Sequence, residues 1–232
     1  MVKAKDLTDE EYLYGHKGCP GCGLGTIGRL ALKILGERTI VALPASCMST
    51  VTTIYPQMNY SVPSFTMAFA GTGAVLTGMS AGLKAQGISD VNVLGIAGDG
   101  GTADIGLQAL SGAVERGDDF IYICYDNEAY MNTGVQRSSL TPIGAHTTNS
   151  PAGTASYGEK RPKKNLFEIM IAHRIPYAAT ASSAYPYDFM NKMEKTKSIK
   201  GPRFIHIMCP CPTGWGFASD LTVEIGKLAV ET

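Results

Sequence analysis

Four short apolar segments alternate along this sequence with longer segments of helical character, and this alternation limits the fold more than any other feature. The apolar segments are nearly continuous, which is typical of parallel strands covered on both faces. They are residues 39–43, 91–97, 120–125 and 204–208. Helices are predicted at residues 26–35, 73–86, 105–116, 166–174 and 187–196. The expected fold is therefore α/β, a doubly wound parallel sheet, in a single domain over residues 1–232.

Residues suited to chemistry follow three of the predicted strands. The segment Gly98–Gly101 follows the second strand, Asp126 and Asn127 follow the third, and Cys209 and Cys211 follow the fourth. In parallel α/β sheets, ligands bind at the carboxyl ends of the strands. We therefore expect one site at this edge of the sheet. Residues 138–162 form a long Thr-, Gly- and Pro-rich loop, and loops of that length are often functional.

Residues 39–83 contain no Asp, Glu, Lys, Arg or His. A membrane span is the obvious alternative, but prolines and many small polar residues interrupt the segment. We expect it to be buried at a cofactor or subunit interface, and no membrane contact is predicted. Lys plus Arg balance Asp plus Glu at 20 each without a basic patch, so no nucleic-acid partner is expected. Residues 1–11 lack the apolar core of a signal peptide, which predicts a cytoplasmic protein.

The six cysteines of such a protein point to metal or redox chemistry before disulfides. Cys19 and Cys22 form a C-x-x-C knuckle whose Gly and Pro residues let backbone amides stabilise the thiolates. Cys47 and the segment Cys209–Cys211 supply further ligands. Four thiolates suit either Zn²⁺ or a 4Fe–4S cluster, and the missing second C-x-x-C of a zinc ribbon favours iron–sulfur. Cys124 lies inside a predicted strand and is expected to be a core thiol.

The segment Gly98–Gly101 has the composition of a diphosphate site. Glycines there allow phosphate oxygens to approach backbone amides, and Asp99 is a hard oxygen ligand suited to Mg²⁺. A simple turn is the alternative interpretation. The segment Asp126–Gly134, which ends the next strand, offers further oxygen ligands beside the first. Together the two segments favour a metal–diphosphate site.

Four motifs occur in a specific order, namely Gly18–Gly23, Gly98–Gly100, Asp126–Gly134 and Cys211–Trp215. The second and third resemble the thiamine-diphosphate motif. All four together resemble the β subunit of the 2-oxoacid:ferredoxin oxidoreductase family, most closely its pyruvate:ferredoxin branch, over nearly the whole chain. Members of that family usually continue well beyond the last motif, whereas this sequence stops at Thr232.

The resemblance implies roles for individual residues. The expected ligands of a 4Fe–4S cluster are Cys19, Cys22, Cys47 and Cys211, with Cys209 as the alternative to Cys211. Mg²⁺ would be held by Asp99, Asn127 and the backbone carbonyl of Ala129. Contacts to thiamine diphosphate are expected from Gly98, Asp99, Gly100, Asn127, Ala129, Cys47 and Ser49. Asn132 resembles the active-site Asn of the family.

The resemblance also implies the reaction and the partners. A 2-oxoacid, pyruvate by default, would be oxidatively decarboxylated to acyl-CoA and CO₂, with electrons passing through the cluster to ferredoxin. No Glu lies between Glu37 and Glu115, so the Glu that activates the thiamine pyrimidine would come from another subunit, and the other subunits would be of alpha, gamma and delta type. A branched-chain 2-oxoacid, 2-oxoglutarate or oxalate stays open as substrate. Three further functions stay open, namely a non-redox thiamine enzyme, a structural zinc protein and a non-catalytic assembly subunit.

Overall fold

The centre of the molecule is a six-stranded parallel sheet, seen in a computed structural model that describes residues 1–53, 55, 56 and 58–232. The strand order is β2-β1-β3-β4-β8-β7, and all five pairings are parallel. The strands are β1 (Thr39–Pro44), β2 (Ser64–Met67), β3 (Asn92–Gly98), β4 (Phe120–Asp126), β7 (Tyr177–Ser182) and β8 (Pro202–Met208). The predicted doubly wound α/β fold is confirmed.

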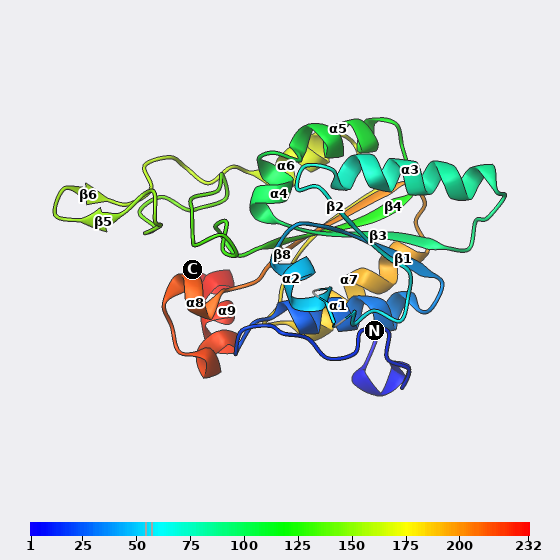
Figure 1. Cartoon of the computed structure of the whole chain (residues 1–232), viewed down its shortest axis with the longest axis horizontal. Helices are drawn as coiled ribbons and strands as arrows, with labels where there is room; N and C mark the ends of the chain where they lie inside the picture. Colours follow the sequence, from blue (N-terminus) through cyan, green and yellow to red (C-terminus); the bar gives the residue numbers. More distant parts are fainter. Residues whose placement is uncertain (54, 57) are drawn as a thin grey trace.

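Helices cover both faces of this sheet (Figure 1). One face carries α3 (Thr72–Ala85), α4 (Asp99–Ala103), α5 (Leu107–Glu115) and α6 (Leu166–Ala172). The other face carries α1 (Leu24–Leu35), α2 (Cys47–Thr52) and α7 (Pro186–Lys197). A short 3₁₀ helix, η1 (Ala4–Asp6), lies near the N-terminus.

The central strand β4 explains why both faces need a cover. Ile121 and Ile123 belong to the apolar cluster shared with α1 and α7, whereas Tyr122 and Cys124 belong to the cluster shared with α3, α5 and α6. Successive side chains of a strand point to opposite faces, so a continuous apolar run buries both. Cys124 is fully buried in this layer, as predicted for a core thiol.

The four predicted strands and five predicted helices are present, and the central sheet has two further strands that were not predicted. These two strands, β2 and β7, form the outer edges of the sheet. The short helices α2 and α4, which follow β1 and β3 directly, were not predicted either. These two strands therefore lead into short helices, and four of the residues predicted to bind ligands, Cys47, Ser49, Asp99 and Gly100, lie in them.

The predicted long loop over residues 138–162 projects from the body as an arm (Figure 1). Its outer part is a short antiparallel hairpin, β5 (Ala152–Gly153) with β6 (Ser156–Tyr157), which was not predicted from the sequence. Its inner end is buried, because Ser138 lies inside the body beside Asp99. The arm thus begins at the predicted site.

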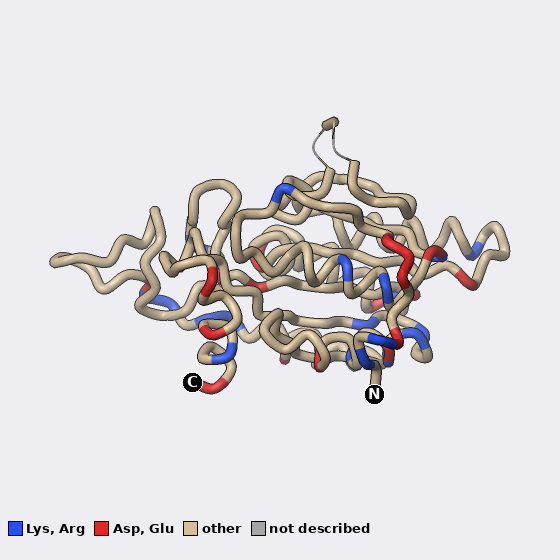
Figure 2. Tube along the Cα trace, turned by 90° about the horizontal axis from the view of Figure 1, so that it is seen from below, with Lys and Arg blue, Asp and Glu red and all other residues tan. Residues whose placement is uncertain are grey.

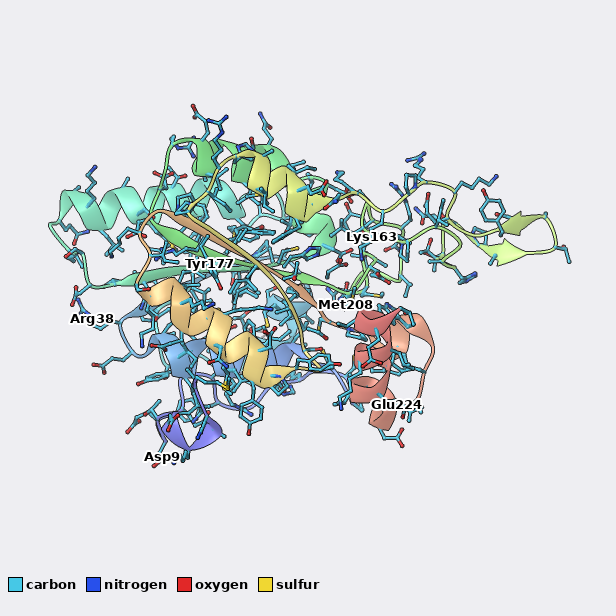
Figure 3. The ribbon with its side chains drawn as sticks, turned by 180° about the vertical axis from the view of Figure 1, so that it is seen from behind. Asp9, Arg38, Lys163, Tyr177, Met208 and Glu224 are labelled. Carbon is cyan, nitrogen blue, oxygen red and sulfur yellow. The ribbon has the colours of Figure 1, made fainter. Side chains whose placement is uncertain are left out.

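The C-terminal segment lies beside the carboxyl end of the sheet. It consists of α8 (Pro212–Trp215), the 3₁₀ helix η2 (Ser219–Leu221) and α9 (Thr222–Glu231), which follow β8 (Figures 1 and 3). Figure 3 shows the labelled Met208, the last residue of β8, next to this segment. The fold thereby brings the C-terminal cysteines toward the ligand-binding edge.

Burial of the charge-free segment 39–83 is only partial within this chain. β1 is buried, but the side chains of Tyr55, Met58 and Phe65 are 89%, 62% and 52% exposed. Figure 2 shows one edge of the molecule largely free of charged residues, and the segment contributes none. Among the described residues, no helix is both long and apolar enough to cross a membrane.

Candidate active site

A small cavity of 60 Å³ lies at the carboxyl ends of β1, β3 and β4. Strand β1 leads into the cavity through Ser46 and Cys47, and β3 leads into it through the segment Gly98–Gly101. The chain continues from β1 to the edge strand β2 and then returns to β3 on the other side of β1. The cavity therefore lies at the switch point of the sheet, where doubly wound folds bind ligands.

Three oxygen atoms converge beside this cavity. The side-chain oxygen of Asn127 is 3.0 Å from Asp99 Oδ1 and 3.0 Å from the backbone carbonyl oxygen of Ala129. Acceptors at these two separations repel one another unless the amide of Asn127 is turned so that its nitrogen donates to both, Asp99 is protonated, or a cation lies between them. With Mg–O distances of about 2.0–2.1 Å, neighbouring ligands of an octahedral Mg²⁺ lie about 2.9 Å apart. The two separations from the Asn127 oxygen match this spacing.

Asp99 is buried at the centre of this group. Ser138 donates a hydrogen bond to its Oδ2 at 2.5 Å. Burial and the neighbouring carboxylate of Asp126 raise the pKa of Asp99 well above its usual value. A buried carboxylate in this position lacks a compensating charge, and a divalent cation would supply one.

Asp126, in contrast, has cationic partners. Lys163 Nζ lies 2.8 Å from Asp126 Oδ2, and His206 Nε2 lies 3.0 Å from the same oxygen. Burial alone would raise the pKa of Asp126, but the His206 hydrogen bond and the Lys163 charge hold it below its usual value. Figure 3 shows the labelled Lys163 where the arm leaves the body. Asp126 therefore has cationic partners within the chain, whereas Asp99 has only hydrogen-bond donors among the described residues.

The glycine at position 100 is needed for close packing. A Cβ atom there would collide with the ring of Tyr130, whose hydroxyl donates a hydrogen bond to Asp104 Oδ2 at 2.8 Å. At Gly98, an added Cβ would lie 3.1 Å from the ring of Tyr125. These glycines let two tyrosines pack against the backbone beside the cavity, so the Gly-Asp-Gly motif has a structural role besides any contact with phosphate.

Helix α2 contains one further predicted residue, Ser49, and contacts another, Asn132. Asn132 lines the cavity, and its side-chain nitrogen donates a hydrogen bond to Thr50 Oγ1 at 3.2 Å. Ser49 does not line the cavity, because its hydroxyl is hydrogen-bonded to the backbone of Ser46 at the start of α2. The structure brings Asn132 and Cys47 to the site but leaves Ser49 as part of the helix cap.

Four thiols from three segments lie close enough for the charge of one to raise the pKa of another. Burial raises the pKa of the Cys47 thiol to about 12, and the neighbouring charges of Cys211, Cys22 and Cys19 act in the same direction. Burial likewise raises the pKa of Cys22 and Cys211. Such thiols need a metal or cluster to become thiolates at neutral pH.

These thiols are not arranged around one metal ion. Among residues 1–53, 55, 56 and 58–232, no three His, Cys, Asp or Glu side chains are close enough to share an ion. Four thiolates on one Zn²⁺, at Zn–S distances of about 2.3 Å, would lie about 3.8 Å apart. Sulfurs that bind four different irons of one cluster lie farther apart.

The knuckle between Cys19 and Cys22 is shaped by Gly21. Its φ is +75°, a left-handed conformation that favours glycine, and a Cβ atom there would collide with the backbone oxygen of Ser219. The knuckle therefore packs directly against the C-terminal segment, close to Cys211. Cys209 is buried, and burial raises its pKa well above the usual value. Cys22 and Cys211 are the neighbouring thiols that affect it, while Cys47 is not among them.

Several residues of the site were not singled out from the sequence. Ser138 donates a hydrogen bond to Asp99, and Tyr130 donates one to Asp104. The Trp215 indole donates to the backbone carbonyl of Asn127. Tyr130 and Trp215 lie inside two of the motifs, so their position in those motifs was the available signal. Nothing in the sequence around Ser138 indicates its contact, which depends on the path of the arm.

The sequence matches a known family and has close relatives. Residues 45–207 match the family described as thiamine pyrophosphate enzyme, C-terminal TPP binding domain. The chain is 58% identical over 228 residues to the pyruvate synthase subunit PorB of Methanothermobacter thermautotrophicus, covering 97% of this chain and 79% of that relative. It is 54% identical over 229 residues to the ketoisovalerate oxidoreductase subunit VorB of Pyrococcus horikoshii, covering 97% and 74%.

A solved structure shares the fold. The chain superposes with a TM-score of 0.72 on the 2-oxoglutarate:ferredoxin oxidoreductase from Magnetococcus marinus, solved with 2-oxoglutarate, coenzyme A and succinyl-CoA bound. The match covers 94% of this chain and 69% of that one, at 21% identity. At this identity the likeness shows a common architecture, while the family follows from the sequence relatives.

Proposed function

Because this chain belongs to the thiamine-diphosphate-dependent 2-oxoacid:ferredoxin oxidoreductases, as a subunit of that multi-subunit enzyme, we propose how it contributes to the reaction. It holds Mg²⁺–thiamine diphosphate at the carboxyl ends of β1, β3 and β4, and it holds one 4Fe–4S cluster through four cysteines. The enzyme oxidatively decarboxylates pyruvate to acyl-CoA and CO₂. Electrons leave through the cluster to ferredoxin.

The observation that carries this proposal is the group of three oxygens. The side-chain oxygen of Asn127 lies 3.0 Å from Asp99 Oδ1 and 3.0 Å from the Ala129 carbonyl oxygen, so with Asp99 ionised these oxygens need either a turned amide or a cation between them. Mg²⁺ would supply the missing positive charge, and the cavity beside Gly98 would receive the phosphate oxygens of the cofactor. Bound thiamine diphosphate supplies the carbanion chemistry, while these residues fix its position.

The mutual proximity of Cys19, Cys22, Cys47 and Cys211 supports them as the cluster ligands. The charges of Cys211, Cys22 and Cys19 each raise the pKa of Cys47, so the four thiols lie near one another. Cys211 also caps α8, where the Gly214 amide donates a hydrogen bond to its sulfur at 3.3 Å. A backbone donor of this kind stabilises a thiolate ligand. A structural zinc site would require sulfurs gathered around a single ion and would make no use of Asp99.

Three features support completion of the site by another subunit. The cavity of 60 Å³ is much smaller than the roughly 300 Å³ or more of a site that encloses a cofactor-sized ligand. No Glu lies between Glu37 and Glu115 to activate a pyrimidine. Tyr55, Met58 and Phe65 are exposed on the charge-free segment, and exposed apolar groups of this kind mark interfaces. Subunits of alpha, gamma and delta type, with ferredoxin and coenzyme A, are the proposed partners.

The substrate proposal rests on the named relatives. Pyruvate follows from pyruvate synthase, and a branched-chain 2-oxoacid is the alternative because the ketoisovalerate relative is nearly as similar. A panel of pyruvate, ketoisovalerate, 2-oxoglutarate and oxalate with the purified complex separates them by kcat/KM. The proposed location is the cytoplasm, where reducing conditions keep cluster thiols free of disulfides.

The isolated chain is expected to have no oxidoreductase activity, even with cluster, Mg²⁺ and thiamine diphosphate supplied. The complex purified with its native partner subunits is expected to reduce ferredoxin with pyruvate and coenzyme A. The measurement is anaerobic ferredoxin reduction by the two preparations at equal cluster content. Full activity from the isolated chain would contradict the proposal, since it would place the pyrimidine-activating Glu within this sequence.

Asn132→Ala is expected to lower turnover much more than cofactor affinity. Asn132 lines the cavity beside Cys47 but lies outside the oxygen group, so its amide can donate to charge that develops on the reacting substrate. Loss of one such preorganised donor costs about 10²–10³ in rate. We would measure kcat and the Kd of the cofactor in the complex. An unchanged kcat would remove Asn132 from the reaction.

A further inference from the structure

The only tryptophan of the chain connects two parts of the site that are far apart in sequence. The indole Nε1 of Trp215 donates a hydrogen bond of 2.9 Å to the backbone carbonyl oxygen of Asn127. The side-chain oxygen of Asn127 belongs to the proposed Mg²⁺ site. The backbone that carries this oxygen is thus held in place from the C-terminal segment.

Trp215 ends the short turn that begins with a proposed cluster ligand. Cys211 is the N-cap of α8, and its carbonyl accepts a hydrogen bond from the Trp215 amide at 2.8 Å. The Gly214 amide donates to the sulfur of the same cysteine. The positions of the thiol and of the indole are therefore fixed by one hydrogen-bonded turn.

A second contact joins the same turn to the same loop. A Cβ atom at Gly214 would collide with the side chain of Met131, so glycine at this position lets Met131 pack onto α8. Met131 lies between Ala129, whose carbonyl belongs to the oxygen group, and Asn132. The turn thus contacts the loop on both sides of Ala129.

The loop needs such support because its backbone is strained. Glu128 lies between the two residues that supply oxygens, and its φ is +69°, a left-handed conformation that is costly for a residue other than glycine. This conformation turns the Asn127 side chain and the Ala129 carbonyl toward each other. Thr141 Oγ1 donates to the Glu128 carbonyl at 2.5 Å, and Lys163 forms an ion pair with the Glu128 carboxylate. Both residues belong to the arm, whereas Trp215 supports the loop from the segment that carries the proposed cluster ligand Cys211.

We propose that Trp215 is a positioning residue that links the cluster to the cofactor: with the cluster bound, the Cys211–Trp215 turn is ordered and the indole holds the Asn127 loop in its Mg²⁺-binding conformation. The inference rests on the proposed function. A subunit without its cluster would then bind Mg²⁺–thiamine diphosphate weakly. The cofactor would therefore be retained mainly by subunits that carry the cluster needed to accept electrons.

The test is a double-mutant cycle in the purified complex, with the Kd of thiamine diphosphate measured by calorimetry at saturating Mg²⁺. Trp215→Phe keeps a ring and removes the donor, and Cys22→Ser removes the cluster without changing any residue of the α8 turn. We expect Trp215→Phe to weaken binding about threefold to tenfold, as for one lost hydrogen bond. Cys22→Ser should weaken binding to a similar degree, and the double variant should bind no more weakly than Trp215→Phe alone.

Phe217→Leu is the matched control. Its ring packs edge-on against Trp215, with centroids 6.3 Å apart, but makes no hydrogen bond to the loop. Its Kd should equal that of the wild type. Should Cys22→Ser prevent assembly, chelator treatment of the wild-type and Trp215→Phe complexes provides the cluster-free measurements. If cluster loss and Trp215→Phe raise the Kd additively, or if Trp215→Phe leaves the Kd unchanged, the proposed link through Trp215 is wrong, while the proposed function still stands. A wild-type complex that binds no cofactor would instead refute the proposed function.

Discussion

Asp99→Ala is expected to abolish binding of Mg²⁺–thiamine diphosphate to the assembled complex. Asp99 is the only carboxylate in the group of three oxygens, so its removal leaves the cation with neutral ligands and the diphosphate poorly compensated. Calorimetric titration of the complex measures the loss directly. Asp90→Ala is the control, since this exposed carboxylate pairs with Arg38 and lies just before β3, at the opposite end of the strand.

A second variant separates lost binding from lost folding. Asp99→Asn keeps the shape and an acceptor for Ser138, but removes the charge. Burial and Asp126 raise the pKa of Asp99, so the ionised carboxylate is disfavoured when no cation is present. Metal-free Asp99→Asn should therefore unfold at a temperature no lower than the wild type, while its cofactor affinity falls steeply. Wild-type affinity in either variant would mean that the Gly-Asp-Gly segment is only a turn.

Cys22→Ser is expected to cause loss of the 4Fe–4S cluster. Cys22 lies in the knuckle that packs on the C-terminal segment, and a neutral hydroxyl replaces a thiolate that neighbours Cys19 and Cys211. Iron and sulfide content and the visible absorption of anaerobically purified protein report the cluster. Stoichiometric zinc without iron in the wild type would contradict the cluster proposal.

Two other cysteines serve as matched controls for this prediction. Cys124→Ser should keep the cluster, because this thiol is buried in β4 on the face that packs against α3 and α5. Cys209→Ser tests the choice of the fourth ligand and should also keep iron, whereas Cys211→Ser should lose it. Retention of the cluster in Cys211→Ser together with its loss in Cys209→Ser would reverse that assignment.

The internal strands and the main helices were predictable because their burial produces local patterns of apolar residues. β3 and β4 are covered on both faces, so each is a continuous apolar run. β2 was missed because its middle residues Phe65 and Thr66 are exposed at the edge of the sheet. β7 was missed because it consists largely of Ala, Thr and Ser, which give no apolar run.

The site residues differ in how far their roles could be predicted from the sequence. The motifs around Asp99, Asn127 and Cys19 have fixed local spacing, which is visible in the sequence. The place of Ser49 could not be predicted, because its hydroxyl is occupied by a helix cap that was itself not predicted. The assignments of cluster and Mg²⁺ ligands stay predictions until the variants above are measured.

The fold class, the family and the segments that carry the chemistry could be predicted from the amino-acid sequence, because periodicity, turn residues and motif spacing are local properties of the chain. Which of these segments contact one another became visible in the folded molecule. Three contacts illustrate this. The Asn127 oxygen lies 3.0 Å from the oxygens of Asp99 and Ala129, Ser138 donates to Asp99, and Trp215 donates to Asn127. Each contact joins residues from different elements or from a strained loop. Such contacts depend on how the sheet orders its strands and on where the arm and the C-terminal segment pack, and these are long-range outcomes of folding.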